Sequence, residues 1–428
     1  MNKTASPAEQ QARRVAETVW RMESPRLIAA LVRMLRDLDL AEDLAQDALL
    51  AALEQWPKQG VPDNPGAWLM TIAKHRAIDR LRRHKLLERK HVELGYELDQ
   101  RQEEIEQMRD EALDDSIGDD LLRLIFTACH PVLSAEARAA LTLRLLGGLS
   151  TEEIARAFLV PEPTMAQRIV RAKRTLGEAE VAFELPRGEA FAERLGSVLQ
   201  VIYLIFNEGY TATTGDDWMR PSLCEEAMRL GRVLIGLVPQ EPEAYGLVAL
   251  MELQASRLPA RSGADGAPIL LREQDRRRWN RLLIQRGLAA LSNAERLQGI
   301  DGIYALQAAI AACHARAQQV EQTDWARIAA LYQRLAERTG SPVVELNRAV
   351  AVSMAQGPAV ALPLVEALRD EGVLAGYHLL PSVHGDLLAR LDRHVEARAE
   401  FLRAAELTRN ERERQLLLQR AAACADLG

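Results

Sequence analysis

The chain has 428 residues, and its 54 lysines and arginines stand against 61 aspartates and glutamates, for a net charge of −7 at pH 7. An apolar content of 48% is sufficient for sizeable cores and excludes wholesale disorder. Aromatic residues make up only 4% of the chain, which favours helices because strands prefer aromatic and β-branched residues. We therefore expect an all-α fold.

Shifts in composition divide the chain into parts. A basic stretch over residues 74–90 is followed by an acidic one over 93–120, so the mild net acidity conceals segregated charge. The expected parts are a compact helical domain at 10–90, an acidic linker at 91–118, a second small helical domain at 119–180, a helical extension at 186–300 and helical repeats at 301–428.

The first domain contains a helix, predicted over residues 39–56, with two different faces. Its apolar stripe consists of Ala41, Ala45, Leu49, Leu53 and Trp56. Another face gathers Asp39, Asp43, Gln46, Asp47 and Leu50. An acidic patch beside an exposed leucine indicates a protein-docking surface, although such a patch by itself is more often a solvated face.

A loop at residues 60–66 precedes a helix that begins near Trp68 and carries polar groups beside aromatic ones. One side of this helix carries Trp68, Ile72, His75, Asp79 and Arg82. The side expected to pack against the domain carries Ala73, Ala77 and Leu81. Interleaved aromatic and basic groups can stack on bases and pair with phosphates.

The second domain carries a helix-turn-helix pattern. Gly147 and Gly148 end a helix predicted over 135–146, and Ser150 with Glu153 forms a capping box for a short helix over 151–157. A turn then leads to Pro163, which suits the first turn of another helix. That helix has an apolar back and a front of long polar side chains, as a major-groove helix requires. The back is Met165, Ile169, Ala172 and Leu176, and the front Thr164, Gln167, Arg168, Arg171 and Arg174.

Beyond residue 186 the chain is expected to be helical again, with a weak repeat near its end. Residues 348–365 align with 384–401 at an offset of 36, which pairs Ala361 with Ala397 and Val365 with Phe401. This spacing resembles a tetratricopeptide hairpin, and an irregular helical bundle is the alternative. The last helices, over 395–425, carry an expected packing stripe of Ala399, Leu402 and Ala405.

Several segments together resemble the extracytoplasmic-function (ECF) sigma factors. Asp39-Leu-Ala-Glu-Asp-Leu-Ala-Gln-Asp47, Ala67-Trp-Leu69 and Ala77-Ile-Asp-Arg-Leu-Arg-Arg83 resemble sigma region 2, while Leu149-Ser-Thr-Glu-Glu-Ile-Ala155 and residues 164–173 resemble region 4. Three further segments resemble the subgroup whose members carry a long C-terminal helical extension ending in tetratricopeptide-like repeats. They are Phe126-Thr-Ala-Cys-His-Pro131, Pro161-Glu-Pro-Thr-Met-Ala166 and Asn207-Glu-Gly-Tyr210.

The resemblance implies core RNA polymerase, through its β′ clamp and β flap, and promoter DNA as partners. The implied polymerase-binding residues are Asp39, Asp43, Gln46, Asp47 and Leu50. Those implied for the minus-ten element are Asn64, Trp68, His75, Arg76, Asp79, Arg82 and Arg83. Those implied for the minus-thirty-five element are Thr164, Gln167, Arg168, Arg171, Lys173 and Arg174. The acidic linker would run through the polymerase's nucleic-acid channel, and the C-terminal repeats would bind a protein or peptide.

Two departures prevent transfer of a promoter preference. Family members often carry asparagine where His75 stands and a basic residue where Ala166 stands. Two other hypotheses stay open, namely a polymerase-independent helix-turn-helix regulator with a sensing helical domain, and a ligand-binding or enzymatic C-terminal domain with DNA-binding segments appended. The acidic docking face favours the sigma factor, because a simple repressor needs no such surface.

The remaining signals predict neither catalysis nor a bound group. No phosphate-binding glycine loop, nucleophile elbow or paired catalytic carboxylate is present, so we expect no enzyme, cofactor or metal. The pairs Cys129-His130 and Cys313-His314 are better explained as buried small residues than as a shared metal site. A polar group at Asn207, Glu208, Tyr210, Asp216 and Asp217 either caps a helix or binds a ligand. The first eleven residues lack an apolar signal core and the longest apolar run is 201–206, so we expect a soluble, cytoplasmic protein without membrane contact.

Overall fold

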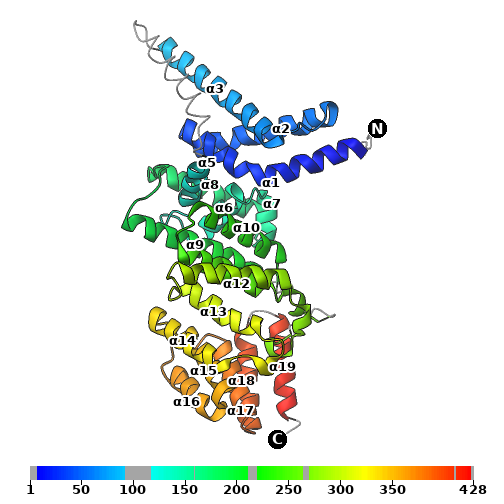
Figure 1. The fold of residues 1–428 in the computed structure, drawn as a ribbon, viewed down its shortest axis with the longest axis vertical. Coiled ribbons are helices and arrows are strands. Elements are labelled where there is room, and N and C mark those ends of the chain that lie inside the picture. The colour runs from blue at the N-terminus through cyan, green and yellow to red at the C-terminus, as the bar shows by residue number, and fades with distance from the viewer. Residues whose placement is uncertain are drawn as a thin grey trace. The chain divides into compact units, whose positions relative to one another are not determined.

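The computed structural model describes residues 7–91, 117–158, 160–210, 219–263, 269–408 and 411–425. Within these ranges every extended regular element is a helix and none is a strand, which confirms the all-α fold (Figure 1). The chain forms two compact units, Met1–Val201 and Ile202–Gly428. The predicted acidic linker falls almost entirely outside the described residues.

The first unit holds the helices that carry the predicted binding residues. They are α1 (Pro7–Leu35), α2 (Leu38–Gln59), α3 (Pro65–His91), α5 (Ile117–Ala128), α6 (Ala135–Leu145), α7 (Thr151–Ala157), α8 (Glu162–Glu178) and the first half of α9 (Glu189–Tyr210). Helix α1 packs against α2, α3 and α5, while α6 and α7 pack against α8. The C-terminal half of α3 extends beyond this packed core (Figure 1).

Short polar residues set where these helices begin. The Asp37 carboxylate accepts a hydrogen bond from the Leu40 amide at 3.0 Å and starts α2. The predicted capping box of α7 is confirmed, because Ser150 and Glu153 each accept a hydrogen bond from the other's backbone amide, at 3.1 and 2.8 Å. The predicted helices over 135–146 and 151–157 are therefore confirmed to within one residue.

The break between α6 and α7 depends on its glycines. Gly148 has a φ of +64°, a conformation that other residues rarely adopt. A β-carbon on Gly147 would lie 2.5 Å from the Leu143 carbonyl oxygen, so this position must also be glycine. The turn that follows α7 brings Pro163 into the first turn of α8, as the sequence predicted.

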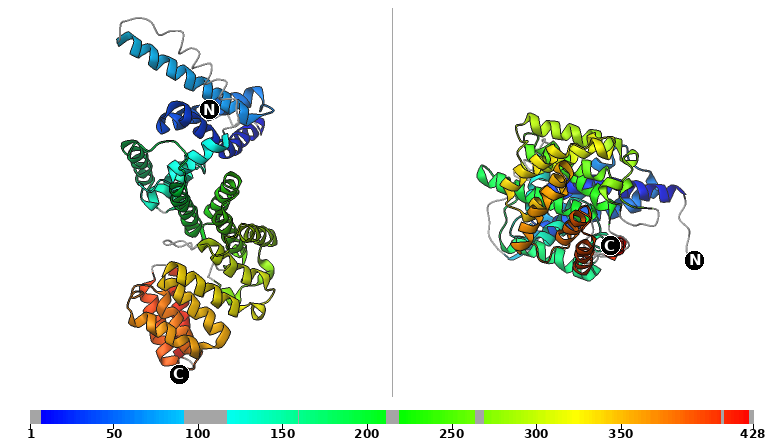
Figure 2. Two further views of the ribbon diagram at one scale, coloured as in Figure 1. Left: turned by 60° about the vertical axis from the view of Figure 1, so that its left-hand side comes forward. Right: turned by 90° about the horizontal axis from the view of Figure 1, so that it is seen from below.

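The second unit contains the second half of α9 followed by further helices. They are α10 (Pro221–Leu237), α11 (Pro242–Ala255), α12 (Arg281–Arg296), α13 (Ile303–Arg316), α14 (Trp325–Thr339), α15 (Pro342–Gln356), α16 (Pro358–Asp370), α17 (Leu379–Ala389), α18 (His394–Leu407) and α19 (Glu411–Ala425), with 3-10 turns η1 (Leu258–Ala260), η2 (Leu271–Glu273), η3 (Arg276–Arg278) and η4 (Val320–Gln322). From α13 to α19 successive helices pack on one another, and Figure 2 shows the last of them side by side.

The 36-residue repeat corresponds to a structural one. Helices α15 and α16 form one packed pair and α17 and α18 the next. Ala361 and Val365 of α16, like Ala397 and Phe401 of α18, are fully buried in a single apolar cluster. Ala361 and Ala397, the small residues of one aligned pair, thus let the second helix of each helical pair pack closely.

The packing stripe predicted for the last helices is wrong at two of its three residues in α18, because only Ala405 is buried. Ala399 is exposed and Leu402 keeps 37% of its surface exposed. The buried face instead contains Ala397, Phe401, Ala404 and Ala405. The helix turns this face inward because Phe401 is its largest apolar side chain, and burying it removes the most apolar surface from water.

The described members of the predicted polar group lie in the last turn of α9, where they make packing contacts. Glu208 forms an ion pair with Arg220. The Tyr210 ring stacks on Phe206, and the guanidinium carbon of Arg261 lies over the Tyr210 ring, 3.7 Å from its centroid. A β-carbon on Gly209 would lie 2.7 Å from the Cys224 backbone nitrogen, so glycine is needed here. Asp216 and Asp217 lie outside the described residues.

Burial also accounts for the cysteines. All of Cys129, Cys224, Cys313 and Cys424 are buried free thiols, and burial raises the pKa of the Cys129 thiol to about 11. The described residues include no group of three or more side chains suited to hold a metal ion. In the same ranges, no helix has the length and apolarity that a bilayer crossing requires.

Candidate functional site

Helix α2 presents the predicted docking face to solvent. Asp39, Asp43 and Leu50 are exposed, and Leu50 keeps 57% of its surface accessible. Gln46 and Asp47 are half-buried. The apolar stripe on the other side is buried at Ala41, Ala45 and Trp56 and half-buried at Leu49 and Leu53. An exposed leucine among carboxylates is available to an apolar and basic partner.

Two contacts hold the edge of this face. The Asp47 carboxylate lies 3.3 Å from the Arg76 guanidinium of α3, with both side chains substantially exposed. The Gln46 amide donates a hydrogen bond of 2.8 Å to the Glu42 carboxylate. Arg76, predicted to contact DNA, therefore pairs with a residue predicted to contact polymerase.

Helix α3 exposes most of the residues predicted for the minus-ten element. His75, Asp79, Arg82 and Arg83 are exposed, while Trp68 is half-buried. The Trp68 ring packs edge-on against Trp56 of α2 with their centroids 5.5 Å apart. Trp68 thus helps to join α2 to α3, and one part of its ring stays accessible.

Asn64 starts α3 rather than standing free in the loop. Its side-chain oxygen accepts a hydrogen bond of 3.1 Å from the Ala67 backbone amide, and its carbonyl oxygen accepts one from the Trp68 amide. This cap fixes where the loop ends and the basic, aromatic face of α3 begins.

Helix α8 divides as predicted. Met165, Ile169, Ala172 and Leu176 are buried. Thr164, Gln167, Arg171 and Arg174 are exposed, and Arg168 is half-buried. The Arg174 guanidinium pairs with Glu178 at 2.7 Å on the open surface. The helix-turn-helix formed by α7 and α8 therefore presents a polar front with an apolar back.

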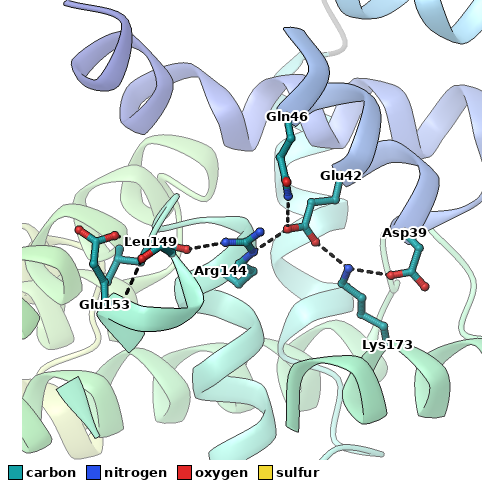
Figure 3. A network of polar contacts seen from close by, with 8 residues as sticks. Asp39, Glu42, Gln46, Arg144, Leu149, Glu153 and Lys173 are labelled. Atoms are coloured by element: carbon teal, nitrogen blue, oxygen red, sulfur yellow. Dashed lines mark hydrogen bonds and ion pairs between the residues drawn. The ribbon is translucent and has the colours of Figure 1, made fainter. Parts of the chain in front are cut away.

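Lys173, unlike the other residues of α8 predicted to bind DNA, forms ion pairs with α2. Its ammonium nitrogen lies 2.7 Å from an Asp39 carboxylate oxygen and 2.6 Å from a Glu42 carboxylate oxygen (Figure 3). Only 12% of the Lys173 side chain is exposed. Glu42 also accepts a hydrogen bond of 2.5 Å from the Arg144 guanidinium of α6, and Arg144 donates another of 3.2 Å to the Leu149 carbonyl. A residue predicted to bind DNA is thus paired with one predicted to bind polymerase.

The opposite charges in this network offset the free-energy cost of removing each of them from water. Burial by itself lowers the pKa of Lys173, but the carboxylates of Glu42 and Asp39 outweigh it and hold that pKa above its ordinary value of 10.5. Only 6% of the Glu42 side chain is exposed, so this carboxylate depends on its two cations. We call Asp39, Glu42, Arg144 and Lys173 the interhelical ion network.

A half-open cleft of about 640 Å³ lies beside this network, with Gln46 and Arg144 in its wall. Across the cleft, Arg21 of α1 forms an ion pair of 2.7 Å with Glu153 of α7. Ion pairs therefore join α1 to α7 and α2 to α6, and an open space remains beside them.

Sequence reasoning missed Glu42 and Arg144. Glu42 lies within an acidic helix segment and nothing in its spacing indicates burial, while Arg144 occupies the last turn of α6, where a basic residue is ordinary. The predicted residues Asp39 and Lys173 were assigned to separate surfaces, and only their tertiary contact joins them.

Comparisons with known proteins follow the same division. Residues 19–86 match the family model for sigma-70 region 2, residues 123–176 that for sigma-70 region 4, and residues 194–295 a family of unknown function, DUF6596. An uncharacterized protein of Rhizobium meliloti (strain 1021) is 46% identical over 390 residues, covering 91% of each chain. An ECF RNA polymerase sigma factor, SigK, of Mycobacterium bovis (strain BCG / Pasteur 1173P2) is 28% identical over 155 residues, covering 35% of this chain and 78% of that protein. No solved structure matches.

Proposed function

Because the chain belongs to the ECF-type RNA polymerase sigma factors and carries a C-terminal helical extension, we propose that its three exposed surfaces divide the work of initiation among them. Core RNA polymerase and promoter DNA are its partners. The sigma-70 regions disfavour a regulator that acts without polymerase. Sigma factors are DNA-binding regulators, and we propose that this chain catalyses nothing itself and acts in the cytoplasm.

The first proposed surface is the docking face of α2. Asp39, Asp43, Gln46, Asp47 and Leu50 would bind the clamp helices of the β′ subunit. Support comes from the exposed Leu50 amid carboxylates, since an interface core needs an apolar anchor and a charged rim can steer the encounter. The helix-turn-helix would lie near the β flap.

The second proposed surface is the side of α3 that faces solvent, with the loop before it. Asn64, Trp68, His75, Arg76, Asp79, Arg82 and Arg83 would read and help to open the minus-ten element. An unpaired base can stack on an aromatic side chain, and exposed arginines can pair with the adjacent phosphates.

The third proposed surface is the front of α8, which would read the minus-thirty-five element in the major groove. Thr164, Gln167, Arg168, Arg171 and Arg174 lie on it or at its edge. Lys173 would reach a phosphate only after leaving Asp39 and Glu42, because only 12% of its side chain is exposed while it pairs with them. Polymerase docking on Asp39 would therefore favour the release of Lys173.

The observation that carries the proposal is the presence, in one compact unit, of an acidic docking helix and a helix-turn-helix. The test is co-purification of the full chain with core polymerase, followed by run-off transcription. Binding to promoter duplex as tight without polymerase as with it would contradict the proposal. The free chain should bind duplex DNA poorly, because its net charge is negative.

The extension is proposed to be required for transcription, and the division of the chain at 10–90, 91–118, 119–180, 186–300 and 301–428 stays a proposal. Helix α9 refines where it should be cut. The ring of Phe191 packs on that of Phe126, with their centroids 5.4 Å apart, and Arg194 donates a hydrogen bond of 2.7 Å to the Phe126 carbonyl. A chain ending at Leu185 would lose this support for α5, whereas one ending at Val201 retains it.

A chain ending at Val201 is therefore the informative truncation. We expect it to fold and to lose transcription, because the extension would complete the polymerase contact. Constitutive transcription would instead indicate that the extension restrains regions 2 and 4. The paired helices α15 to α18 would supply a surface for a protein or peptide partner, as stacked helical pairs generally do.

A further inference from the structure

One apolar side chain stands among the polar residues on the front of α8. Val170 exposes 64% of its surface. Gln167 lies three residues before it and Arg174 four residues after it, and side chains at these spacings share one face of a helix. The buried back of the helix, from Met165 to Leu176, lies opposite. Val170 thus lies at the edge of the front, beside Arg174, and its exposure shows that it contributes little to the core.

The side chains beside Val170 differ in what they already bind. Arg174 pairs with Glu178, and Lys173 pairs with Asp39 and Glu42. Within the part of the chain that the structure describes, neither Gln167 nor Arg171 has a side-chain hydrogen bond or ion pair. Gln167 lies one turn before the consecutive residues Val170 and Arg171, and the three exposed side chains together form a contact patch.

This patch offers three different chemistries to a base-pair edge in the major groove. A glutamine amide can form a bidentate pair with adenine and an arginine with guanine. Valine can do neither, because it has no donor or acceptor. Among the four bases only thymine presents an apolar group there, its 5-methyl group. A valine at this place gains free energy from removing that methyl group from water.

We propose that Val170 is a specificity-determining residue that selects thymine in the minus-thirty-five element by contact with the 5-methyl group. The inference rests on the proposed role of α8 as the reader of that element. Beyond that role, it identifies one base of the element and the apolar residue that would contact this base. The neighbouring positions would carry adenine opposite Gln167 and guanine opposite Arg171.

The experiment uses holoenzyme assembled from the full chain and core polymerase, with a pool of promoter duplexes whose minus-thirty-five element is randomised. Bound duplexes are sequenced, and each enriched thymine is then replaced by deoxyuridine, which lacks only the methyl group. Wild-type holoenzyme should enrich thymine and should bind the deoxyuridine duplex about fourfold more weakly, the equivalent of one buried methyl group.

The variant Val170→Ser removes both methyl groups at an exposed site, so the fold is expected to persist. It should lose the thymine enrichment and bind the thymine and deoxyuridine duplexes within about twofold of each other. Val132→Ser is the matched control, because Val132 is another exposed valine of the first unit and lies outside α8. It should behave as wild type.

Two failures are distinguishable. If Arg171→Ala changes the enriched element while deoxyuridine is bound as well as thymine by wild-type holoenzyme, α8 reads the element and the role of Val170 is refuted. If neither Arg171→Ala nor Val170→Ser changes the enriched element, α8 is not its reader, and the proposed function of this helix fails together with the inference.

Discussion

The Lys173 ammonium nitrogen lies 2.7 Å from the Asp39 carboxylate, so the two surfaces predicted for DNA and for polymerase meet in one ion pair. Glu42 strengthens the contact, because its buried carboxylate pairs with both Lys173 and Arg144. In this contact only 12% of the Lys173 side chain is exposed, whereas 72% of the Asp39 side chain remains accessible. A phosphate could therefore reach Lys173 only if Lys173 left this contact, whereas a basic group could approach Asp39 with the pair in place.

Replacing Lys173 by methionine should loosen the contact between α2 and α8. The buried Glu42 carboxylate would keep Arg144 and lose its second cation, at a cost of up to about 3 kcal/mol. Hydrogen exchange in α2 and α8 should therefore become faster by up to about a hundredfold. Arg174→Met is the matched control, since the pair of Arg174 and Glu178 is exposed and contributes little. Equal effects of the two variants would contradict the expectation.

Reversing the charges of Asp43 and Asp47 to lysine should weaken the binding of core polymerase at least about tenfold, because it places like charges against a basic partner. Fluorescence anisotropy with labelled full chain measures this affinity. The control is Glu189→Lys with Glu193→Lys, which reverses two exposed carboxylates at the same spacing on α9. If both double variants bind core polymerase equally well, the docking face lies elsewhere.

His75→Ala should impair opening of the minus-ten element and leave the fold intact, because His75 is exposed on α3. Loss of a stacked base would cost about 1–3 kcal/mol, visible as weaker permanganate reactivity of the thymines in the open complex. Trp68 is a poorer test, since its ring also packs on Trp56. Arg13→Ala, at an exposed position of α1, should give a normal footprint, and a normal footprint with His75→Ala would remove His75 from this role.

The second unit should lose stability in mild acid through His314. Burial first, and then the nearby Arg257 and Arg276, lower the pKa of His314 to about 3, so its ring stays neutral in the folded chain. The unfolded chain takes up the proton near pH 6.5. The contribution of His314 is therefore complete above pH 6.5 and is lost as the pH falls from 6.5 towards 3.

Urea unfolding of the full chain, followed at the second unit between pH 7.5 and 4.5, measures this dependence. The free energy of unfolding should fall by up to about 1.4 kcal/mol per pH unit more steeply in wild type than in His314→Gln, which cannot titrate. Parallel pH profiles for the two proteins would show that another group is responsible.

Local patterns in the sequence were enough for the helices and for the general layout of the first unit. The capping box of Ser150 and Glu153, the glycine break before it and the apolar spacing of α8 depend on residues within a few positions of one another, so they could be predicted. The exposed acidic face of α2 was predictable for the same reason. The stripe on α18 was misplaced because two apolar spacings coexist there, and only contact with α17 and α19 decides which one is buried.

Tertiary structure alone decided which charged residues are free. Asp39 and Lys173 are 134 residues apart, and the burial of Glu42 between Lys173 and Arg144 follows from how helices distant in sequence pack together. A helical period specifies which residues share a face but not what faces them. The sequence by itself therefore determined the helices, the sigma regions and the candidate surfaces. The ion pairs of α2 with α6 and α8 determined that two of those surfaces are joined. An ion pair depends on distances of a few ångströms that no local pattern records.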